Sequence, residues 1–578
     1  MVDMVTRPER KTIWIAAFLL LLALGFRLFV ALRLPNDTPD DGRVYAQIAR
    51  NVLEQHVYSH EEQPPFVPSL IRLPGYPFFL AAIYSVAGHT NNTAVRVVQA
   101  VVDTGTCLLI ALVASLWVND QRWKRTAALA ALGLAAVCPF TTIYVATILT
   151  EVPTSFLAVL MCLLATLAFK STNYRRKLVL WFLTGLTCGV AVFFRPDSGL
   201  FAAATGFTIL LSSLAARYKQ KLSHRFLKSV LSAAVFSIAF CLVLVPWTIR
   251  NRRVFGVFQP LSPAHGEMPG EFVPRGYLMW LRTWLDDGRY IGPVLWRLDT
   301  SIIPIEAFPK KAFDSAEERE RVAALMDKYN HPVDQDEAQA SPSDSPQTNS
   351  PATTSADTSS TPNQQPSPTG SVKPGSTSSP PPSPQVTAEQ NGEDATQSNE
   401  SDDESDDEDS EEQPTDETQS NVEMTPEIDA AFAQLARERI ARAPFRYYVG
   451  LPVKRAVALW FDTHSQYYPF DGNLLPLRDL DYDIHQQYWL PLFAGLTWIY
   501  TILGVLGGFF LLRLRSVEGK LWVVFAGLVI FLRLGFFSTL ENPEPRYVVE
   551  IFPFLSILGG IVIGLLFTWR APKRELSR

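Results

Sequence analysis

Apolar runs long enough to cross a membrane recur in both the N-terminal and the C-terminal part of this 578-residue chain. A membrane helix needs about 20 apolar residues, because each residue adds about 1.5 Å and the hydrocarbon layer is about 30 Å thick. The pattern predicts ten spans, at 13–32, 97–118, 126–145, 152–169, 178–194, 199–215, 228–247, 488–511, 520–538 and 547–568. The apolar stretch 76–88 is too short to cross, and we expect it to be re-entrant or interfacial.

The basic residues next to these spans predict the orientation of the chain. When 76–88 does not cross, every strongly basic cluster falls on one side, at 7–11, 122–125, 175–177, 217–228, 513–520 and 570–578. Short loops rich in Lys and Arg remain in the cytoplasm. We therefore predict an all-α polytopic membrane protein, with about 10 transmembrane helices plus interfacial helices. It should be a multi-pass plasma (inner) membrane protein with cytoplasmic termini and a large extracytoplasmic loop.

A strongly polar segment, 333–425, interrupts that large loop. It holds 21 of the 57 acidic residues and one of the 51 basic ones, and Ser, Pro, Thr and Gln fill most of the rest. Such a segment buries too little apolar surface to offset the entropy of ordering, so we predict a disordered insert. The rest of the chain has 50 basic and 36 acidic residues, so the net charge of −6 comes from this insert alone.

The spans and the insert together predict the domain organisation. Residues 1–248 form an N-terminal transmembrane module with a first extracytoplasmic loop at 33–96. Residues 249–332 and 426–485 form a small extracytoplasmic domain, and residues 486–578 form the C-terminal transmembrane helices. In the small domain a helix is predicted from the spacing of Ile428, Phe432, Leu435, Ala436 and Ile440, and Pro444 ends it. Tyr277, Trp280 and Trp284 are more typical of a core or an interfacial anchor than of a sugar platform.

Two adjacent carboxylates, Asp40 and Asp41, follow the first span. An apolar stripe at helical spacing comes next, formed by Val44, Tyr45, Ile48 and Val52. We expect an amphipathic helix that floats in the interface and holds Asp41 near its start. A carboxylate there can act as general base on a substrate carried by a lipid.

Other polar residues lie at ends of spans on the same predicted side, and they are Arg72, Glu151, Arg195, Asp197, Arg250, Asn251, Glu541 and Arg546. Each alone is more typical of an interfacial anchor. Together, acids beside arginines suit a reaction in which a hydroxyl is deprotonated while a phosphate leaves, because arginine binds phosphate oxygens through a planar fork. Asp103 lies inside a span with Arg96 and Gln99 on its helix face, and is either paired locally or turned toward a substrate.

Several of these motifs resemble the bacterial GT-C glycosyltransferases, in particular the protein O-mannosyltransferase and lipid A aminoarabinose transferase group. They are Asp40-Asp41 before a tyrosine-containing helix, Leu73-Pro74-Gly75-Tyr76-Pro77, Arg195-Pro196, Pro246-Trp247 with Arg250-Asn251, and Arg546-Tyr547. The resemblance covers residues 10–260 and 488–569. It departs from the family at Gly42, which stands where the family often has a Glu after the catalytic Asp; Asp40 is the acid that could compensate.

The resemblance implies a polyprenyl-phosphate sugar donor, presented from the membrane lipid, and a protein, lipid or glycan acceptor. It implies that Asp41, four residues before Tyr45, is the catalytic base with Asp40 beside it. It also implies that arginines hold the donor phosphate, and the candidates here are Arg72, Arg250, Arg546 and Arg195. Tyr45, Glu151, Asp103, Asn251 and Glu541 are further active-site candidates.

The expected chemistry is an inverting displacement, which requires no cofactor. His56 and His60 precede Glu61 and Glu62 and could hold a divalent cation, but an exposed polar loop explains them as well. The five cysteines all lie in apolar runs, so neither disulfides nor a thiolate metal site is expected, and no nucleic-acid partner is implied.

Two other classes of function stay open. A transporter or flippase of lipid-linked glycans would carry polar groups along a crossing path, whereas the spans between 126 and 247 have almost no charges inside them. A structural or sensory membrane protein would use the acidic insert to bind a basic partner.

Overall fold

The computed structural model describes residues 10–34, 40–88, 90–215, 222–332, 422–461, 468, 484–513 and 517–569. All regular structure in these ranges is helical, and no strand occurs in them. The α-helices are α1 (Arg10–Arg33), α2 (Asp40–Glu54), α3 (Gly75–Ala87), α4 (Asn92–Trp117), α5 (Gln121–Ala136), α6 (Pro139–Thr142), α7 (Glu151–Lys170), α8 (Tyr174–Phe194), α9 (Gly199–Ala215), α10 (Leu222–Phe255), α11 (Arg275–Leu281), α12 (Ala316–Asn330), α13 (Pro426–Arg442), α14 (Leu451–Phe461), α15 (Ile484–Arg513), α16 (Val517–Phe537) and α17 (Phe552–Trp569).

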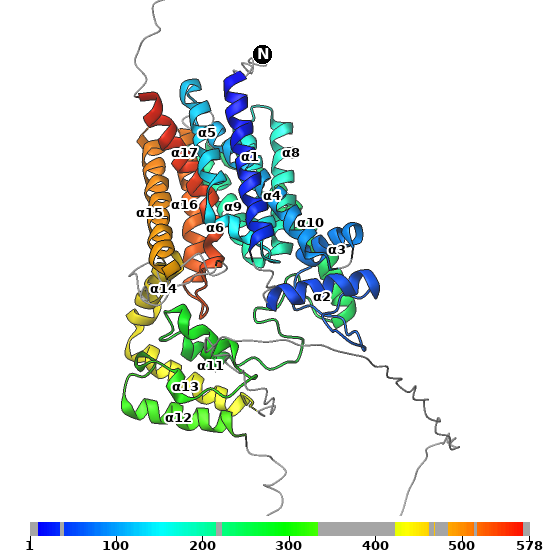
Figure 1. The fold of residues 1–578 in the computed structure, drawn as a ribbon, viewed down its shortest axis with the longest axis vertical. Helices are drawn as coiled ribbons and strands as arrows, with labels where there is room; N and C mark the ends of the chain where they lie inside the picture. Colours follow the sequence, from blue (N-terminus) through cyan, green and yellow to red (C-terminus); the bar gives the residue numbers. More distant parts are fainter. Residues whose placement is uncertain are drawn as a thin grey trace, which may run out of the picture. The chain divides into compact units, whose positions relative to one another are not determined.

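Short 3-10 or π-helical turns connect several of these helices. They are η1 (Ile143–Val145), η2 (Pro196–Ser198), η3 (Gly288–Tyr290), η4 (Gly292–Trp296), η5 (Ile305–Ala307), η6 (Lys310–Ala312), η7 (Arg446–Gly450) and η8 (Pro545–Ile551). The long helices of the bundle lie side by side, and α2, α3 and α11–α13 lie beyond one end of it (Figure 1).

Eight helices of the described part are long and apolar enough to cross a membrane, or nine if the bent pair of α5 with α6 and η1 counts as one span. The prediction of an all-α polytopic membrane protein is therefore confirmed, although the number of spans differs from ten. The predicted span 199–215 forms α9, a helix of 17 residues that is not among the eight. The predicted insert lies almost entirely outside the described residues.

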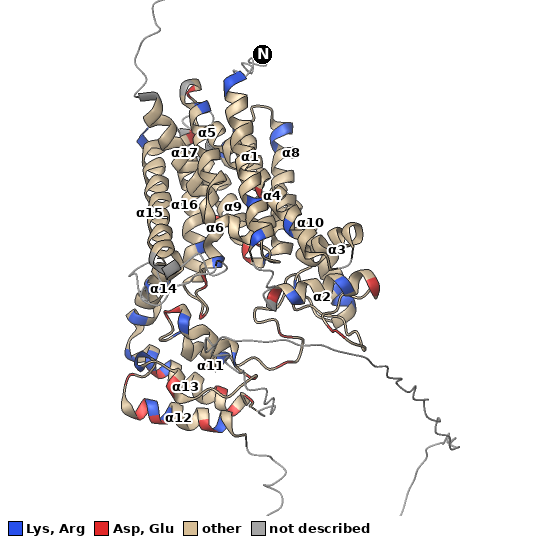
Figure 2. Ribbon diagram, in the orientation of Figure 1, with Lys and Arg blue, Asp and Glu red and all other residues tan. Residues whose placement is uncertain are grey.

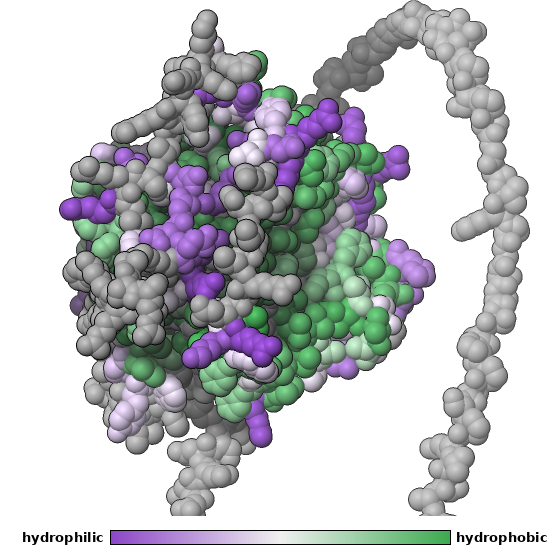
Figure 3. Space-filling model, turned by 90° about the horizontal axis from the view of Figure 1, so that it is seen from above, coloured by the Kyte–Doolittle hydropathy of each residue, from purple (hydrophilic) through white to green (hydrophobic). Residues whose placement is uncertain are grey.

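The surface of the bundle agrees with a membrane environment. The middle stretches of α1, α15 and α16 carry few charges (Figure 2), and large apolar side chains such as Phe18, Val505 and Phe531 are exposed on them. In the view from above, hydrophobic residues cover one flank and hydrophilic ones gather on the end that faces the viewer (Figure 3).

The predicted span 126–145 is broken rather than continuous, with a bend of 53° between α5 and the α6–η1 segment. Pro139 disfavours a helical conformation at the residue before it and cannot donate a backbone hydrogen bond. The carbonyls left open at the end of α5 accept hydrogen bonds from Arg27, whose guanidinium lies 3.1 Å from the oxygens of Ala135 and Ala136. The same guanidinium pairs with Asp103 at 2.7 Å, so the break is held from inside the bundle.

Small residues bring α17 and α5 into close contact. A Cβ atom on Gly560 would lie 2.4 Å from the Cβ of Ala131, and one on Gly564 would lie 2.6 Å from the backbone of Ala127. Small residues four apart on facing helices allow such an approach, as is common between membrane helices. Helix α17 is accordingly the most enclosed span.

Helix α2 begins at Asp40, as predicted, but its apolar stripe packs on protein. Ile48 and Val52 contact Tyr58 and Trp247, and Tyr45 packs on Tyr76 of α3 with ring centroids 5.2 Å apart. The expectation that α2 floats in the interface is therefore wrong, because α3 and the residues around Tyr58 and Trp247 cover its apolar face. The stretch 76–88 forms the short helix α3, which is not among the eight.

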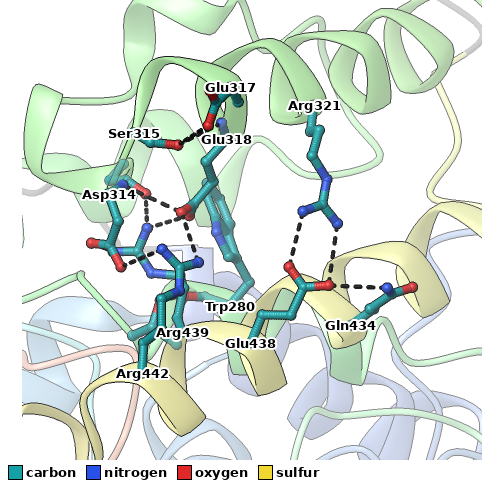
Figure 4. A network of polar contacts seen from close by, with 12 residues as sticks. Trp280, Asp314, Ser315, Glu317, Glu318, Arg321, Gln434, Glu438, Arg439 and Arg442 are labelled. Atoms are coloured by element: carbon teal, nitrogen blue, oxygen red, sulfur yellow. Dashed lines mark hydrogen bonds and ion pairs between the residues drawn. The ribbon is translucent and has the colours of Figure 1, made fainter.

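Helices α11, α12 and α13 enclose a separate hydrophobic cluster. Tyr277, Trp280 and Trp284 are buried in it, which confirms the core interpretation of these aromatic residues. The predicted helix around Phe432 is α13, which ends before Pro444 as expected. Ion pairs join α13 to the segment before and within α12: Arg439 contacts Asp314 and Glu318, Arg442 contacts the same two acids, and Arg321 pairs with Glu438 (Figure 4).

Candidate functional site

Asp41 lies between two guanidinium groups that come from distant parts of the chain. Its Oδ1 is 2.7 Å from Nη2 of Arg72, which precedes α3, and its Oδ2 is 3.2 Å from Nη1 of Arg546, the second residue of η8. The carboxylate keeps a third of its side-chain surface exposed, whereas Arg546 is more enclosed. The structure thus brings together three of the predicted site residues. Asp40 begins α2, but its side chain lies outside the described part.

Local contacts hold Arg72 and Arg546 in position beside Asp41. The hydroxyl of Tyr58 donates to the carbonyl oxygen of Arg72 at 3.1 Å, which fixes the segment between α2 and α3. Nε of Arg546 lies 2.5 Å from a carboxylate oxygen of Glu544. Glu544 also accepts hydrogen bonds from Asn542 and from the hydroxyl of Tyr547. The loop before α17 is therefore held in a shape that directs Arg546 to Asp41.

The charges of the site act on Asp41 and Tyr45. Burial disfavours the charged form of Asp41, but the guanidinium charges of Arg546 and Arg72 outweigh it and hold its pKa below the usual value. Burial, with the nearby charges of Asp41 and Glu151, raises the pKa of Tyr45 to about 12 against the opposing charges of Arg72 and Arg195. At neutral pH the site therefore contains an ionised carboxylate beside a tyrosine that keeps its proton.

A second, largely buried ion network lies at the ends of α7, α8, α16 and η8. Arg195 pairs with Glu151 at 2.7 Å and with Asp197 at 3.1 Å. Arg533 pairs with Asp197 at 2.6 Å and with Glu550 at 2.7 Å. Burial opposes their charges, yet the three acids hold the pKa of Arg195 well above its usual value, and Arg195 and Arg533 hold that of Asp197 below its usual value.

This network is linked to the Asp41 site through η8. Arg533 donates from Nε to the carbonyl oxygen of Tyr547 at 2.6 Å, one residue after Arg546. Both guanidinium groups also contact the ring of Tyr547: that of Arg195 lies 5.6 Å and that of Arg546 5.3 Å from its centroid. The enclosed charges therefore position the backbone that carries Arg546.

Two other predicted site residues, Arg250 and Asn251, have structural contacts of their own. Arg250 stacks on Trp247 and Tyr58 and donates to the carbonyl of Ser69, and no ion pair joins it to Asp41 in the described part. Asn251 is buried and donates to a backbone carbonyl of the following loop. Both lie inside α10, which continues through Pro246 to Phe255 and so extends beyond 247, the predicted end of the span.

The two remaining candidates pair away from Asp41. Glu541 lies 2.6 Å from Nε of Arg282, which follows α11, so it joins the loop before η8 to the small helical cluster. Asp103 pairs with Arg27 rather than with Arg96 or Gln99 on its own helix. Gln99 instead binds the hydroxyl of Tyr76.

Sequence reasoning missed Arg533 and Glu550, although a signal was present. Each is a single charge of its kind in an apolar run, Arg533 in α16 and Glu550 before α17. Ionisable residues in such runs are costly and generally paired or functional. The candidate residues were chosen among charges at the ends of spans, whereas Arg533 and Glu550 lie within predicted spans.

An open cavity of about 600 Å³ lies beside the first loop, lined mainly by residues 257–275 together with Leu70. Leu70, two residues before Arg72, lines it, and Gly266 of the same loop approaches Arg72, since a Cβ there would lie 3.7 Å from the guanidinium. Polar and apolar groups both line it, including Glu267, Glu271 and Phe272.

The described residues contain no group of three His, Cys, Asp or Glu side chains able to hold a metal ion. The arginines around Asp41 also favour an anionic ligand over a cation, since their positive charges occupy both carboxylate oxygens.

Comparison with known proteins adds a family match. The sequence model of the dolichyl-phosphate-mannose-protein mannosyltransferase family matches residues 67–241. No curated protein matches the chain. Among solved structures, the Archaeoglobus fulgidus oligosaccharyltransferase tethered to an acceptor peptide is 11% identical with a TM-score of 0.46, covering 98% of this chain and 51% of its own. The same organism's oligosaccharyltransferase AglB, with an inhibitory peptide and a dolichol-phosphate, is 12% identical with a TM-score of 0.45, covering 99% and 53%.

The chain thus spans about half the length of the solved structures that it resembles. The family match includes Arg72 and Arg195 but ends before Arg546. It confirms the resemblance expected from the sequence: through residues 67–241, this chain is similar to the dolichyl-phosphate-mannose-protein mannosyltransferases, which are GT-C glycosyltransferases.

Proposed function

We propose that this protein transfers a sugar from a polyprenyl-phosphate donor to an acceptor hydroxyl at the extracytoplasmic surface of the plasma membrane. The observation that carries the proposal is the position of Asp41, held between Arg72 and Arg546 at the end of a membrane bundle. A carboxylate beside two guanidinium groups provides a base and a phosphate site within a few ångströms of each other. The description of the matching family, which names a dolichyl-phosphate sugar, supports a lipid-linked donor.

The proposed reaction is a single displacement with inversion. Asp41 accepts the proton of the acceptor hydroxyl, and the oxygen forms a bond to the anomeric carbon of the sugar. The bond from that carbon to the phosphate oxygen breaks at the same time, and the electron pair leaves with the polyprenyl phosphate. The charge that develops on the phosphate is stabilised by the arginines.

Donor binding should also adjust the basicity of Asp41. Without a donor both carboxylate oxygens face guanidinium groups, which lowers the pKa of Asp41 and makes it a weak base. A phosphate that shares Arg72 and Arg546 would withdraw part of this stabilisation, and the pKa of Asp41 would rise. Nε of Arg72 is buried and has no hydrogen-bond partner within the described residues, so it is one donor that a phosphate could use.

The distribution of charge supports the orientation that we propose. Basic residues mark the ends of α1 and α8 that are remote from α2, in the upper part of Figure 2. By the preference of basic loops for the cytoplasm, those ends are cytoplasmic and Asp41 is extracytoplasmic. The helical cluster of α11–α13 is then an extracytoplasmic domain, within the domain organisation predicted from the sequence.

The acceptor hydroxyl belongs to a protein, a lipid or a glycan. The cavity lined by residues 257–275 is the place from which an acceptor could reach Asp41, because it lies beside Arg72 and is open. Its mixed polar and apolar lining suits a flexible polar chain with apolar substituents.

The decisive experiment compares wild-type protein with Asp41→Asn in nanodiscs that contain radiolabelled polyprenyl-phosphate sugars. Wild type should transfer label to protein, lipid or glycan. The variant should lose about 10²–10⁴-fold of this rate, which is the usual contribution of a general base. Glu62→Gln, an exposed acid of the same loop, is the matched control and should keep full activity.

Thermal denaturation of the variant should resemble that of wild type, because the charge removed is partly exposed. Label transfer by Asp41→Asn at a wild-type rate would refute the role of Asp41. The absence of transfer by the wild-type protein from every polyprenyl-phosphate sugar would refute the glycosyltransferase.

A further inference from the structure

Helix α14 and the turn η7 before it have their apolar side turned outward. The exposed residues form an outward stripe at helical spacing, namely Phe445, Tyr448, Val449, Val453 and Val457. Phe445 is 74% and Val453 is 58% exposed. A helix at a water-facing protein surface has the opposite arrangement, with charged residues outside and an apolar face toward the core.

The inward side of the same helix carries a charge. Arg455 is buried between Leu451 and Leu459, and its guanidinium donates to the carbonyl oxygens of Arg282 and Leu285 at 2.6 Å. These carbonyls follow the C-terminal end of α11, where backbone oxygens lack helical partners. The helix thus places its arginine against polar backbone and its valines outside.

The outward stripe is continuous with the lipid-facing surface of the bundle. Phe461, at the end of α14, packs on Trp498 of α15 with ring centroids 4.8 Å apart, and Trp460 donates to Thr501 at 2.9 Å. Around this contact α15 exposes apolar residues, including Trp498 and Ile502.

The contact between Phe461 and Trp498 also indicates how deep the end of α14 lies in the membrane. The span Tyr488–Arg513 has 26 residues, about 39 Å at 1.5 Å per residue, which exceeds a hydrocarbon layer of about 30 Å by about 9 Å. With the span centred, Trp498 lies about 10 Å inside the hydrocarbon, because it is ten residues after Tyr488. The end of α14 shares this depth.

Lys454, the charged residue on the exposed side, fits this placement. Its side chain is 70% exposed, and its amine lies 3.8 Å from the carboxylate of Asp286, which belongs to the polar loop after α11. A lysine near a membrane boundary extends its charge toward water while its carbon chain stays among lipids.

From these contacts we propose that residues 445–461 are inserted in the bilayer leaflet next to the Asp41 site, with acyl chains covering the outward stripe. The segment enters from the polar domain and ends within the hydrocarbon, without crossing it. This proposal concerns the membrane alone and does not depend on sugar transfer.

The test uses nitroxide labels on single cysteines in the full chain, reconstituted in liposomes of phosphatidylcholine and phosphatidylglycerol. Four native cysteines are buried, and Cys241, which is exposed, is first replaced by Ser. Labels are placed at Val453→Cys and Val457→Cys. Val505→Cys on α15 is the lipid reference, and Glu320→Cys on α12 is the water reference. Collision rates with oxygen and with a water-soluble nickel chelate are then compared.

We expect the oxygen-to-nickel ratio at Val457 to exceed that at Glu320 several-fold and to approach that at Val505. The ratio at Val453, next to Lys454 at the boundary, should lie between those at Val457 and Glu320. The ratio should be higher at Val457 than at Phe445→Cys, which lies nearer the polar domain. Ratios equal to that of Glu320 would mean that water covers the stripe and would overturn the proposal. Low collision rates with both reagents would mean that protein covers it, for instance a second copy, and would overturn it equally. If one cysteine variant fails to fold, Val449→Cys replaces it.

Discussion

The enclosed network around Arg533 leads to a prediction about stability that depends on charge rather than on size. Arg533 is fully buried and contacts Asp197 and Glu550 at 2.6 and 2.7 Å. Arg533→Met keeps most of the side-chain volume but leaves these two carboxylates with Arg195 as their remaining cation. Removing one partner of a buried ion pair costs about 3–5 kcal/mol, and we expect a loss of this size in the free energy of unfolding.

A triple variant separates charge from packing. When Asp197→Asn and Glu550→Gln are added to Arg533→Met, the uncompensated negative charges disappear. Replacing a whole buried ion group by neutral residues is often close to neutral for stability. The triple variant should therefore recover most of the loss seen in the single variant.

The dependence on pH has a definite sign. In wild type, burial opposes ionisation of Asp197, but Arg195 and Arg533 hold its pKa below the usual value. Such a group stabilises the fold above its unfolded pKa, and this stability is lost as the pH falls through the folded pKa. Without Arg533 the pKa of Asp197 rises, so protonation relieves the penalty earlier. The deficit of Arg533→Met should be smaller at pH 5 than at pH 8.

Reversible denaturation in mixed detergent micelles, followed by circular dichroism, measures these differences. Arg513→Met, at the exposed end of α15, is the control and should change stability by no more than about 0.5 kcal/mol. A loss below 1 kcal/mol for Arg533→Met, or a triple variant as unstable as the single one, would refute the reasoning.

Three further predictions follow from the site and its supports. Arg546→Gln removes a charge that lowers the pKa of Asp41, so the acid limb of kcat/KM in the transfer assay should move to higher pH. Glu541→Arg should reduce transfer, and adding Arg282→Glu should restore part of it, because the two side chains form one ion pair; equal activity of the single and double variants would contradict this. Gly560→Ala should lower stability by about 1–3 kcal/mol in thermal denaturation, since its new methyl group would overlap α5.

The helices were predictable because apolar runs and helical spacing are local properties. Helix α2 begins at the two predicted carboxylates, and α13 has the expected apolar face. The break after α5 could have been predicted from Pro139, which disfavours helix continuation. The continuation of α10 through Pro246 could not, because neighbouring contacts decide whether a helix bends or ends at a proline.

The site was predictable in its residue types but only partly in its partners. Asp41, Arg72 and Arg546 were placed on one side of the membrane by topology, and the structure joins them directly. Topology predicts which residues lie at the same membrane surface, but not where they lie within that surface. It could therefore not predict that Arg546, and not Arg250, contacts Asp41. Arg250 is equally close to the boundary but is stacked on Trp247.

The partner of Asp103 could have been predicted by comparing how deep the charged residues lie in the membrane, whereas helical spacing indicated the wrong partner. Asp103 has Arg96 and Gln99 on its own helix face, but its partner is Arg27 of α1. Arg27 lies 17 residues from the start of α1, and Asp103 lies 14 residues from the end of α4. At 1.5 Å per residue, Arg27 lies about 26 Å and Asp103 about 21 Å from the same face of the bundle. This difference in depth, about 5 Å, is within reach of an arginine side chain. Opposite charges inside different spans should therefore be matched by depth before a partner is sought on the same helix, because an isolated charge at that depth is costly.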